Sequence, residues 1–261
     1  MLDAILLGLL AQAPLYSADA LVNAASGRPG CFAPNSLGVL YGANFTYGGP
    51  FDASREPSFP TSLNDTLLYL NRDSAPLVYV SATQINFWIP ARILPQSMPV
   101  RVVNKGFYGP TIDIVIVAAC PELFTDPNGF AAASHPDGAV VTPANPARPG
   151  GVVVLYGTGF GATAPVDTGR ARPTVASPLV ASDGFFVELD DQPVPASQLW
   201  YAGLTPGFHG LYQVNLTLPD WTPANPLVRV RAAGAAPSRA VRLAVQPGGG
   251  GNPTAEPRVL H

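Results

Sequence analysis

The sequence predicts an all-β protein that contains two tandem β-sandwich domains, and three observations support this prediction. The first is that the 261-residue chain holds 30 Pro and 26 Gly, which interrupt nearly every window long enough for a helix. The second is that 47% of the residues are hydrophobic and only 12% are charged, so the chain can bury a sizeable core and suits short strands joined by turns. The third is an internal repeat.

The repeat consists of two pairs of matching segments in the same order. Residues 199–219, LWYAGLTPGFHGLYQVNLTLP, are a longer copy of residues 77–90, LVYVSATQINFWIP. Upstream, residues 153–160, VVLYGTGF, match residues 38–45, GVLYGANF. Because the order is kept, the pattern indicates a tandem duplication of one unit.

Three matched residue pairs measure the offset between the two copies. The members of each pair are 115, 122 and 129 residues apart: Tyr41 with Tyr156, Tyr79 with Tyr201, and Gln84 with Gln213. The offset grows by 7 and again by 7, which predicts two loop insertions in the second copy. Each copy has about the size of one immunoglobulin-like sandwich, on the order of 100 residues.

The first immunoglobulin-like domain is expected to span residues 21–120. Its strands are expected where β-branched and aromatic residues lie between turn residues. A half-buried strand at residues 20–26 precedes a turn at 27–30, and residues 47–60 are expected to form a loop. The remaining strands are expected at residues 37–41, 66–70, 77–80, 84–89, 100–103 and 111–118.

The second domain is expected to span residues 121–246. It begins with a hairpin, in which residues 130–134 and 139–142 flank a turn whose Asp137 and Gly138 favour a tight reversal. Another turn is expected at residues 190–191. Further strands are expected at residues 152–156, 185–189, 199–202, 211–218, 227–232 and 240–245. The Gly- and Pro-rich tail, residues 247–261, is expected to be flexible.

Residues 1–20 are expected to be a signal peptide for export. Residues 4–13 form an apolar core that is too short to span a bilayer, and the small residues Ala18 and Ala20 suit a cut after Ala20. No Lys or Arg precedes Arg28, so the alternative is an uncleaved segment that packs on the domain or on a neighbouring subunit. Export would give a secreted or cell-surface protein with no membrane span after signal removal.

The two cysteines are expected to form a disulfide. Cys31 follows the first strand and Cys120 ends the first domain, so a bond between them would join the start and the end of one domain. Closing this loop stabilises the fold by roughly 4 kcal/mol in the chain-entropy model, and an exported protein meets the oxidising conditions that the bond needs. The alternative is two unpaired, buried thiols.

Three segments together resemble a known family. They are VNAAS at residues 22–26, PANPARPG at 143–150 and the segment at 201–219. Residues 20–246 thereby resemble the Solibacter-type uncharacterised C-terminal domain family of acidobacterial secreted proteins. The resemblance implies tandem immunoglobulin-like modules of the IPT/TIG-like kind and an extracellular address, and it implies no activity.

Composition and motif spacing argue against the binding of nucleic acid, a cofactor or a metal ion. A net charge of −3 without a basic run gives no electrostatic footprint for nucleic acid or for an anionic membrane. Residues 157–162, GTGFGA, match a dinucleotide-binding string, but no helix is expected after them to hold a pyrophosphate. The three histidines lack the spacing of a zinc site. Calcium at the acidic turns is a weaker alternative, and we expect a protein that is not an enzyme.

Each copy also contains a Gln-x-Asn segment, in which both amides lie on one face of a strand. The two segments contribute the pairs Gln84 with Asn86 and Gln213 with Asn215. We expect these amides to be structural, as hydrogen-bond partners for loop backbone. Contact with a ligand is the alternative.

The best candidate for recognition is the extra loop of the second copy, residues 203–212, with the aromatic residues next to it. The candidate residues are Trp200, Tyr201, Leu204, Phe208, His209 and Tyr212. Aromatic surfaces of this kind bind proteins or sugars. The alternative is that these side chains fold inward and close the end of the sandwich.

The sequence therefore favours a secreted or cell-surface tandem immunoglobulin-like protein with a structural or adhesive role. The expected partners are a cell-surface protein, a polysaccharide or other copies of the chain, which would assemble through pairing of edge strands. A carbohydrate-binding accessory module that uses residues 203–212 is the first alternative. A hydrolase assembled from distant residues is the second, less favoured one.

Overall fold

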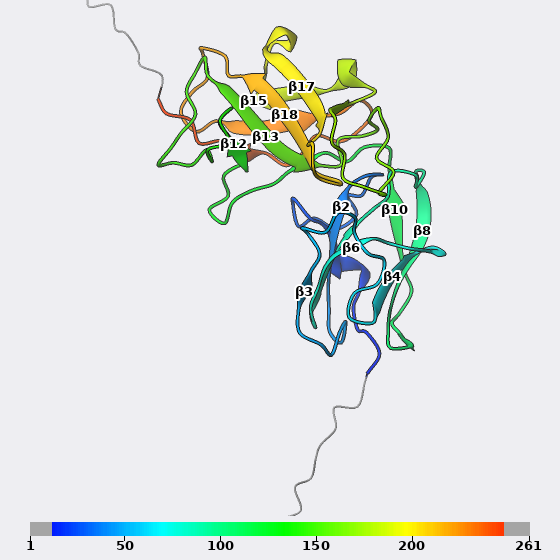
Figure 1. Ribbon diagram of the computed structural model, residues 1–261. Coiled ribbons are helices and arrows are strands. Elements are labelled where there is room, and N and C mark those ends of the chain that lie inside the picture. Colours follow the sequence, from blue (N-terminus) through cyan, green and yellow to red (C-terminus); the bar gives the residue numbers. More distant parts are fainter. Residues whose placement is uncertain (1–11, 248–261) are drawn as a thin grey trace, which may run out of the picture.

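The computed structural model describes residues 12–247 and contains two β-sandwiches, one after the other along the chain (Figure 1). Residues 1–11 of the expected signal peptide and residues 248–261 of the expected tail lie outside the described residues. In the described part of the chain, no helix is long and apolar enough to cross a membrane.

The first domain is built from two antiparallel sheets. One sheet has the order β1-β2-β7-β6-β3, and the other has the order β10-β8-β4-β5 with β9 paired to β8. A short 3-10 helix, η1 (Ala18–Ala20), leads into the domain. The strands are β1 (Leu21–Asn23), β2 (Leu37–Tyr41), β3 (Phe51–Asp52), β4 (Thr66–Leu70), β5 (Asp73–Ser74), β6 (Leu77–Val80), β7 (Gln84–Trp88), β8 (Gln96–Asn104), β9 (Phe107–Tyr108) and β10 (Ile112–Ile116).

The second domain repeats this arrangement. Its sheets have the orders β11-β13-β18-β17-β14, with β12 paired to β13, and β16-β15-β19-β20. Two 3-10 helices, η2 (Ser182–Gly184) and η3 (Ala196–Gln198), lie in its loops. The strands are β11 (Glu122–Leu123), β12 (Ala133–Ser134), β13 (Val152–Thr158), β14 (Ser177–Pro178), β15 (Phe186–Leu189), β16 (Gln192–Pro193), β17 (Leu199–Leu204), β18 (Tyr212–Thr217), β19 (Leu227–Arg231) and β20 (Val241–Arg242).

Both domains have the strand order of an immunoglobulin sandwich. In the first domain, β1, β2, β7 and β6 correspond to strands A, B, E and D of an immunoglobulin sandwich. In the facing sheet, β5, β4, β8 and β10 correspond to strands C′, C, F and G. The same assignment holds for β11, β13, β18 and β17 and for β16, β15, β19 and β20. The predicted all-β, tandem immunoglobulin-like fold is therefore confirmed.

The two copies also share their strand register. Tyr41 lies opposite Gln84 in the first domain, and Tyr156 lies opposite Gln213 in the second. The pairing of β6 with β7 is irregular between Leu77 and Tyr79, and the pairing of β17 with β18 is irregular between Leu199 and Tyr201. A duplicated unit explains why the same bulge occurs twice.

The insertions of the second copy differ in part from the prediction. The second one lies between Tyr201 and Gln213: the connection 205–211 replaces residues 81–83, and β17 and β18 are also longer than β6 and β7. The first insertion is divided into two parts. Leu70 and Leu189 occupy the same hairpin position and are 119 residues apart, an offset that lies between the 115 of Tyr41 and Tyr156 and the 122 of Tyr79 and Tyr201. Four extra residues therefore precede β15, and three, which coincide with η3, precede β17.

Several predicted strands have the bounds that the sequence indicated, while others differ. β2, β4 and β6 span the predicted residues, but the predicted loop 47–60 contains β3, which pairs with β6. The predicted hairpin 130–142 keeps its turn, with a hydrogen bond from Gly138 N to His135 O, although only β12 forms a strand there. β8 and β13 are longer than predicted, whereas β10 and β20 are shorter.

Each sandwich encloses its own core. In the first domain, large side chains such as Phe87, Leu40 and Val100 are buried between the sheets, and Val214, Leu155 and Val230 fill the same space in the second. Alternation along β4 and β18, where buried and half-buried residues take turns, places one face of each strand in the core.

The described part of the expected signal peptide packs on the first domain. Leu15 forms a bridge with Ala43, and the Tyr16 ring lies 5.9 Å from the ring of Phe45. The Tyr16 hydroxyl accepts a hydrogen bond from Val102 N at 2.7 Å and donates one to Pro110 O. Residues 12–20 thus adopt the alternative of a packed segment, and a cut after Ala20 would remove these contacts.

Candidate functional site

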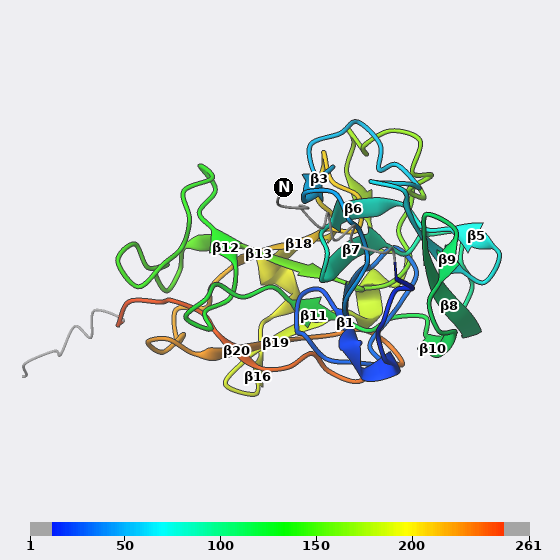
Figure 2. The same ribbon diagram turned by 90° about the horizontal axis from the view of Figure 1, so that it is seen from below.

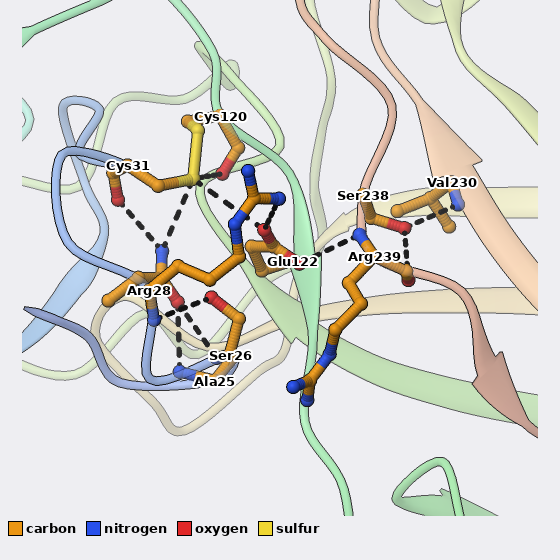
Figure 3. Close-up of polar contacts among 10 residues, drawn as sticks. Ala25, Ser26, Arg28, Cys31, Cys120, Glu122, Val230, Ser238 and Arg239 are labelled. Atoms are coloured by element: carbon orange, nitrogen blue, oxygen red, sulfur yellow. Dashed lines mark hydrogen bonds and ion pairs between the residues drawn. A yellow bond between two sulfur atoms is a disulfide. The ribbon is translucent and has the colours of Figure 1, made fainter.

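The two domains meet at a junction that is held together at two places, and a disulfide lies at the first. Cys31 and Cys120 are bonded, with the sulfur atoms 2.00 Å and the Cα atoms 5.6 Å apart (Figure 3). The bond closes an 89-residue loop and ties the segment that leaves the first domain to the loop after β1. The predicted disulfide is therefore present.

A buried carboxylate lies next to this bond (Figure 3). The side chain of Glu122 is only 2% exposed, and its Oε1 accepts from a guanidinium nitrogen of Arg28, in the first domain, at 3.2 Å. Its Oε2 accepts from the backbone N of Arg239, in the second domain, at 3.0 Å. Because both carboxylate oxygens are used, one on each domain, Glu122 links the two sandwiches at the start of β11.

The loop that was predicted to bind a partner forms the second contact. Leu204, His209 and Tyr212 are buried, so the recognition prediction is wrong for these three residues and the packing alternative holds for them. The Tyr212 hydroxyl donates to Gly161 O at 2.6 Å, and its ring packs 5.1 Å from Phe160. Burial raises the pKa of the Tyr212 hydroxyl well above its usual value.

His209 is the centre of the contact between the domains. Its Nδ1 lies 2.8 Å from Oδ2 and 3.0 Å from Oδ1 of Asp167, so Nδ1 donates to the carboxylate. The ring lies between Trp88 and Phe59 of the first domain, at 5.2 and 5.1 Å between ring centroids. The carboxylate fixes the orientation of the imidazole, and the imidazole fills an aromatic slot in the other domain.

Trp88, at the end of β7, provides the floor of that slot. It is 2% exposed, and its Nε1 donates to Oδ1 of Asn35 at 2.8 Å. Gly169 and Gly210 of the second domain approach so closely that an added Cβ would lie 2.6 and 2.8 Å from the indole. Glycine is needed at both positions, because any side chain would push the domains apart.

Arg172 extends the contact to the loop that carries β3. Its guanidinium donates to Glu56 O at 2.9 Å, to Gly207 O at 2.8 Å and to Ser54 O. Seen from below, this loop of the second domain lies beside the loop of β3 (Figure 2). Because two of the three acceptors belong to the first domain, Arg172 joins the domains with a fork of hydrogen bonds.

The exposed part of the junction is a groove of about 570 Å³. The Arg172 guanidinium lies 5.7 Å from the centre of the Phe59 ring and 5.8 Å from that of Phe208. Phe208 remains 47% exposed. The groove is largely apolar because the Arg172 guanidinium already donates its hydrogen bonds to backbone carbonyls.

The amide pairs hydrogen-bond within themselves. Gln84 Nε2 donates to Asn86 Oδ1 at 2.7 Å, and Gln213 Nε2 donates to Asn215 Oδ1 at 3.0 Å. The predicted bonds to loop backbone are replaced by bonds between neighbours on one strand face, since residues two apart in a strand lie side by side. All four side chains are half-buried on the outer face of their sheet.

Trp200 and Tyr201, the remaining candidates, lie on β17 and differ in exposure. Trp200 is 70% exposed, and its Nε1 donates to Thr217 Oγ1 at 3.0 Å. Tyr201 is half-buried, and its hydroxyl donates to Leu204 O at 2.7 Å and accepts from Ser177 N at 3.1 Å. Of the six predicted residues, Trp200 and Phe208 are therefore the ones that present an aromatic surface to solvent.

Sequence reasoning did not find Asp167, Trp88 or Arg172, which hold the junction. Asp167 lies in the loop before β14, in the part of the chain where four residues are inserted. The growing offset between the copies was the sequence signal that could have pointed to the junction, because both insertions supply residues to it. Among the described residues, no group of three or more His, Cys, Asp or Glu is placed to hold a metal ion.

Comparisons with known proteins identify no family. No family model matches the chain, and no curated protein does. In solved structures, the chain is similar to an SGBP-B from the mixed-linkage glucan utilization locus of Bacteroides ovatus, in complex with a mixed-linkage heptasaccharide, at 12% identity and a TM-score of 0.37. It is also similar to an SGBP-B from a complex xyloglucan utilization locus of Bacteroides uniformis, at 12% identity and a TM-score of 0.27.

A third similar structure is FdeC, an Escherichia coli adhesin, at 10% identity and a TM-score of 0.24. The alignments include 91%, 90% and 90% of this chain in that order, and 47%, 49% and 66% of the other chains. The chain thus spans about half the length of the two SGBP-B proteins. Each likeness concerns the β-sandwich fold alone.

Proposed function

We propose that this chain is an exported, non-enzymatic protein that presents binding surfaces at the cell surface, with a structural or adhesive role. The observation that carries the proposal is the junction, where Asp167, His209 and Arg172 of the second domain join Trp88 and Phe59 of the first. A pair of sandwiches fixed in this way holds its outer faces at a constant angle. Rigid presentation of surfaces is what adhesion and scaffolding require.

Two further features support an extracellular address. The Cys31–Cys120 disulfide suits an oxidising compartment. The resemblance of residues 20–246 to the Solibacter-type family of secreted proteins implies the same address.

Location and adhesion test this proposal directly. Intact cells that produce the protein are treated with protease and fractionated, and a deletion strain is compared with the parent for attachment to surfaces and to other cells. We expect protease to remove the protein from intact cells and the deletion to reduce attachment. A protein that stays in the cytoplasm, protected from protease and with reduced cysteines, would contradict the proposal.

Self-assembly is a second candidate that one strand favours. β10 is an edge strand of its sheet and pairs with β8, its outer edge forms a bridge with Phe32 at its last residue, Ile116, and Val115 is 54% exposed. An exposed apolar edge offers unpaired backbone groups to another chain. Sedimentation over a hundredfold range of concentration tests this candidate, and replacement of Val115 by Lys should abolish any assembly that uses the edge.

A further inference from the structure

The second domain has a surface that corresponds to the docking surface of the first. In the first domain, Asn35 N donates to Ile89 O at 2.8 Å, and in the second domain Gly150 N donates to Leu218 O at the same distance. The turns that follow also match, because Ile93 N donates to Pro90 O and Thr222 N donates to Pro219 O, each at 3.0 Å. The two ends therefore have the same backbone and differ in their side chains.

The side chains on these two surfaces differ in exposure. Trp88 pairs with Leu37, and at the same register Thr217 pairs with Val152. Trp88 is 2% exposed, since the second domain covers it. In the second domain the bulge residue Trp200, which corresponds to Val78, is 70% exposed. A large aromatic ring thus stands in solvent next to Thr217, the residue that corresponds to Trp88.

The indole of Trp200 is held in place before any ligand arrives. Its Nε1 donates to Thr217 Oγ1 at 3.0 Å, and its backbone lies in the bulge between Leu199 and Tyr201. An aromatic ring fixed in this way loses little freedom on binding. A pre-oriented indole face is a platform for a flat, partly apolar ligand surface such as that of a sugar ring.

Polar groups that are free to bind lie on the same sheet face. Gln213, Asn215 and Thr217 occupy alternate positions of β18, opposite the buried side of the strand. Because Gln213 Nε2 donates to Asn215 Oδ1, the pair keeps Gln213 Oε1 as an acceptor and Asn215 Nδ2 as a donor. Within residues 12–247, neither of these two atoms takes part in a hydrogen bond. An acceptor and a donor side by side suit a hydroxylated ligand.

A polar groove continues this surface beyond Val152. The groove has a volume of about 680 Å³, and besides Val152 its lining includes His135, Asp137, Arg148 and Gln246. The lining includes one carboxylate, Asp137, and one guanidinium, Arg148, so these two charges cancel. A polyanion would meet no excess of positive charge there, and an apolar peptide would leave its polar groups without partners.

We propose that this face of the second domain binds a neutral polysaccharide. A sugar ring stacks on Trp200, its hydroxyl groups bond to Gln213, Asn215 and Thr217, and the chain continues over Val152 into the groove. The inference rests on the proposed function and assigns its ligand class, and it moves carbohydrate contact from the loop 203–212 to the sheet beside it.

Affinity gel electrophoresis of the full chain tests the inference. The gels contain soluble glucans, xylans, mannans or galactans as neutral probes, or polygalacturonate as an acidic one. We expect at least one neutral polysaccharide to retard the protein, and Trp200→Ala to raise the dissociation constant at least tenfold, which corresponds to about 1.4 kcal/mol. Trp200→Tyr should keep part of the affinity, because it restores an aromatic face.

Matched variants separate binding from folding. Gln213→Ala should weaken retardation, whereas Gln84→Ala, the same change in the corresponding pair of the first domain, should leave it unchanged. Tyr108→Ala removes another aromatic residue, 63% exposed, and should also have no effect. Thermal unfolding of Trp200→Ala should match that of the parent, since the indole is mostly in solvent.

Three results would overturn the inference. They are the absence of retardation by every neutral polysaccharide, retardation by polygalacturonate alone, and unchanged binding by Trp200→Ala. If Trp200→Ala instead abolishes self-association without any effect of polysaccharide, this face docks a second copy and the inference is wrong. A protein located at the cell surface that binds no neutral polysaccharide would refute this inference alone, whereas a cytoplasmic location would refute the proposed function.

Discussion

His209 and Asp167 form a hydrogen-bonded pair that solvent does not reach, with Nδ1 and Oδ2 2.8 Å apart and side chains 0% and 1% exposed. Both residues come from loops of the second copy that are longer than those of the first. The imidazole inserts between two aromatic rings of the first domain. Residues that distinguish the second copy from the first therefore form one of the two contacts that join the copies.

Replacement of Asp167 by Ala should loosen the junction. The change leaves His209 Nδ1 without its partner and also removes the acceptor for Gly169 N, and an unsatisfied buried group costs about 1–3 kcal/mol. Urea unfolding should show a lower midpoint. Asp183→Ala, at an exposed carboxylate in η2, is the control, and equal midpoints for the two variants would contradict the role of the pair.

Glycine 210 should be sensitive to a single added methyl group. In Gly210→Ala the new Cβ would lie 2.8 Å from Trp88 Cδ1 and 3.0 Å from Leu37 Cγ, whereas in Gly207→Ala it would meet nothing within 4 Å. Both residues have a positive φ, of 68° and 87°, so the backbone strain is similar. We expect Gly210→Ala to be less stable than Gly207→Ala by about 1–3 kcal/mol, measured by urea unfolding. Equal stability would show that the domains do not meet there.

Removal of the disulfide should destabilise the protein substantially. The bond closes an 89-residue loop, and the double variant Cys31→Ala, Cys120→Ala should lose about 4 kcal/mol of unfolding free energy. Titration of the denatured, unreduced parent should detect no free thiol. Two free thiols would disprove the bond.

Stability should fall in alkaline solution because of buried tyrosines. Desolvation raises the pKa of Tyr212, and burial also raises the pKa of Tyr16. An unfolded tyrosine ionises near pH 10, so the stabilisation is complete below about pH 10 and is lost as the pH rises towards the folded pKa. Chemical unfolding between pH 8 and pH 11 should show this decline, and it should be shallower in Tyr212→Phe. A decline of the same steepness in that variant would exclude Tyr212 as its source.

Truncation should locate the start of the folded unit. A chain without residues 1–13 keeps the Leu15–Ala43 bridge and the Tyr16 hydrogen bonds, whereas a chain without residues 1–20 loses both. We expect the longer deletion to unfold at a lower temperature than the shorter one, which loses the hydrogen bonds from Tyr47 to Gln12 O and from Asn44 to Ala13 O. Identical melting temperatures would mean that residues 14–20 contribute nothing to stability.

The sequence predicted the fold well because the repeat and the turn residues are local signals. Short runs of strand-forming residues at 66–70 and 77–80 indicated the bounds of β4 and β6, and the change of offset located the β17–β18 insertion. β3 was missed because a strand of two residues has too few positions for a period. The divided first insertion was also missed, since η3 resembles any other polar loop in sequence.

The candidate site was harder to predict because burial by another domain leaves no local pattern. His209 and Phe208 are neighbours in one loop, yet the first is buried against Trp88 and the second is 47% exposed. Trp88 is 121 residues away from His209, and nothing in either segment indicates the other. Trp200 and Tyr212 differ in exposure for another reason, because Tyr212 lies on the inner face of β18 and packs in the core of its own domain, whereas Trp200 is 70% exposed.

The central claim is that the insertions of the second copy fix the two sandwiches in one relative orientation. The distance between spin labels at Asp113→Cys in β10 and Arg242→Cys in β20, measured by pulsed electron paramagnetic resonance, tests this most directly, because both positions are exposed. The junction predicts one narrow distance distribution, which broadens in Asp167→Ala. A broad distribution in the otherwise unchanged protein, with no effect of Asp167→Ala, would contradict it.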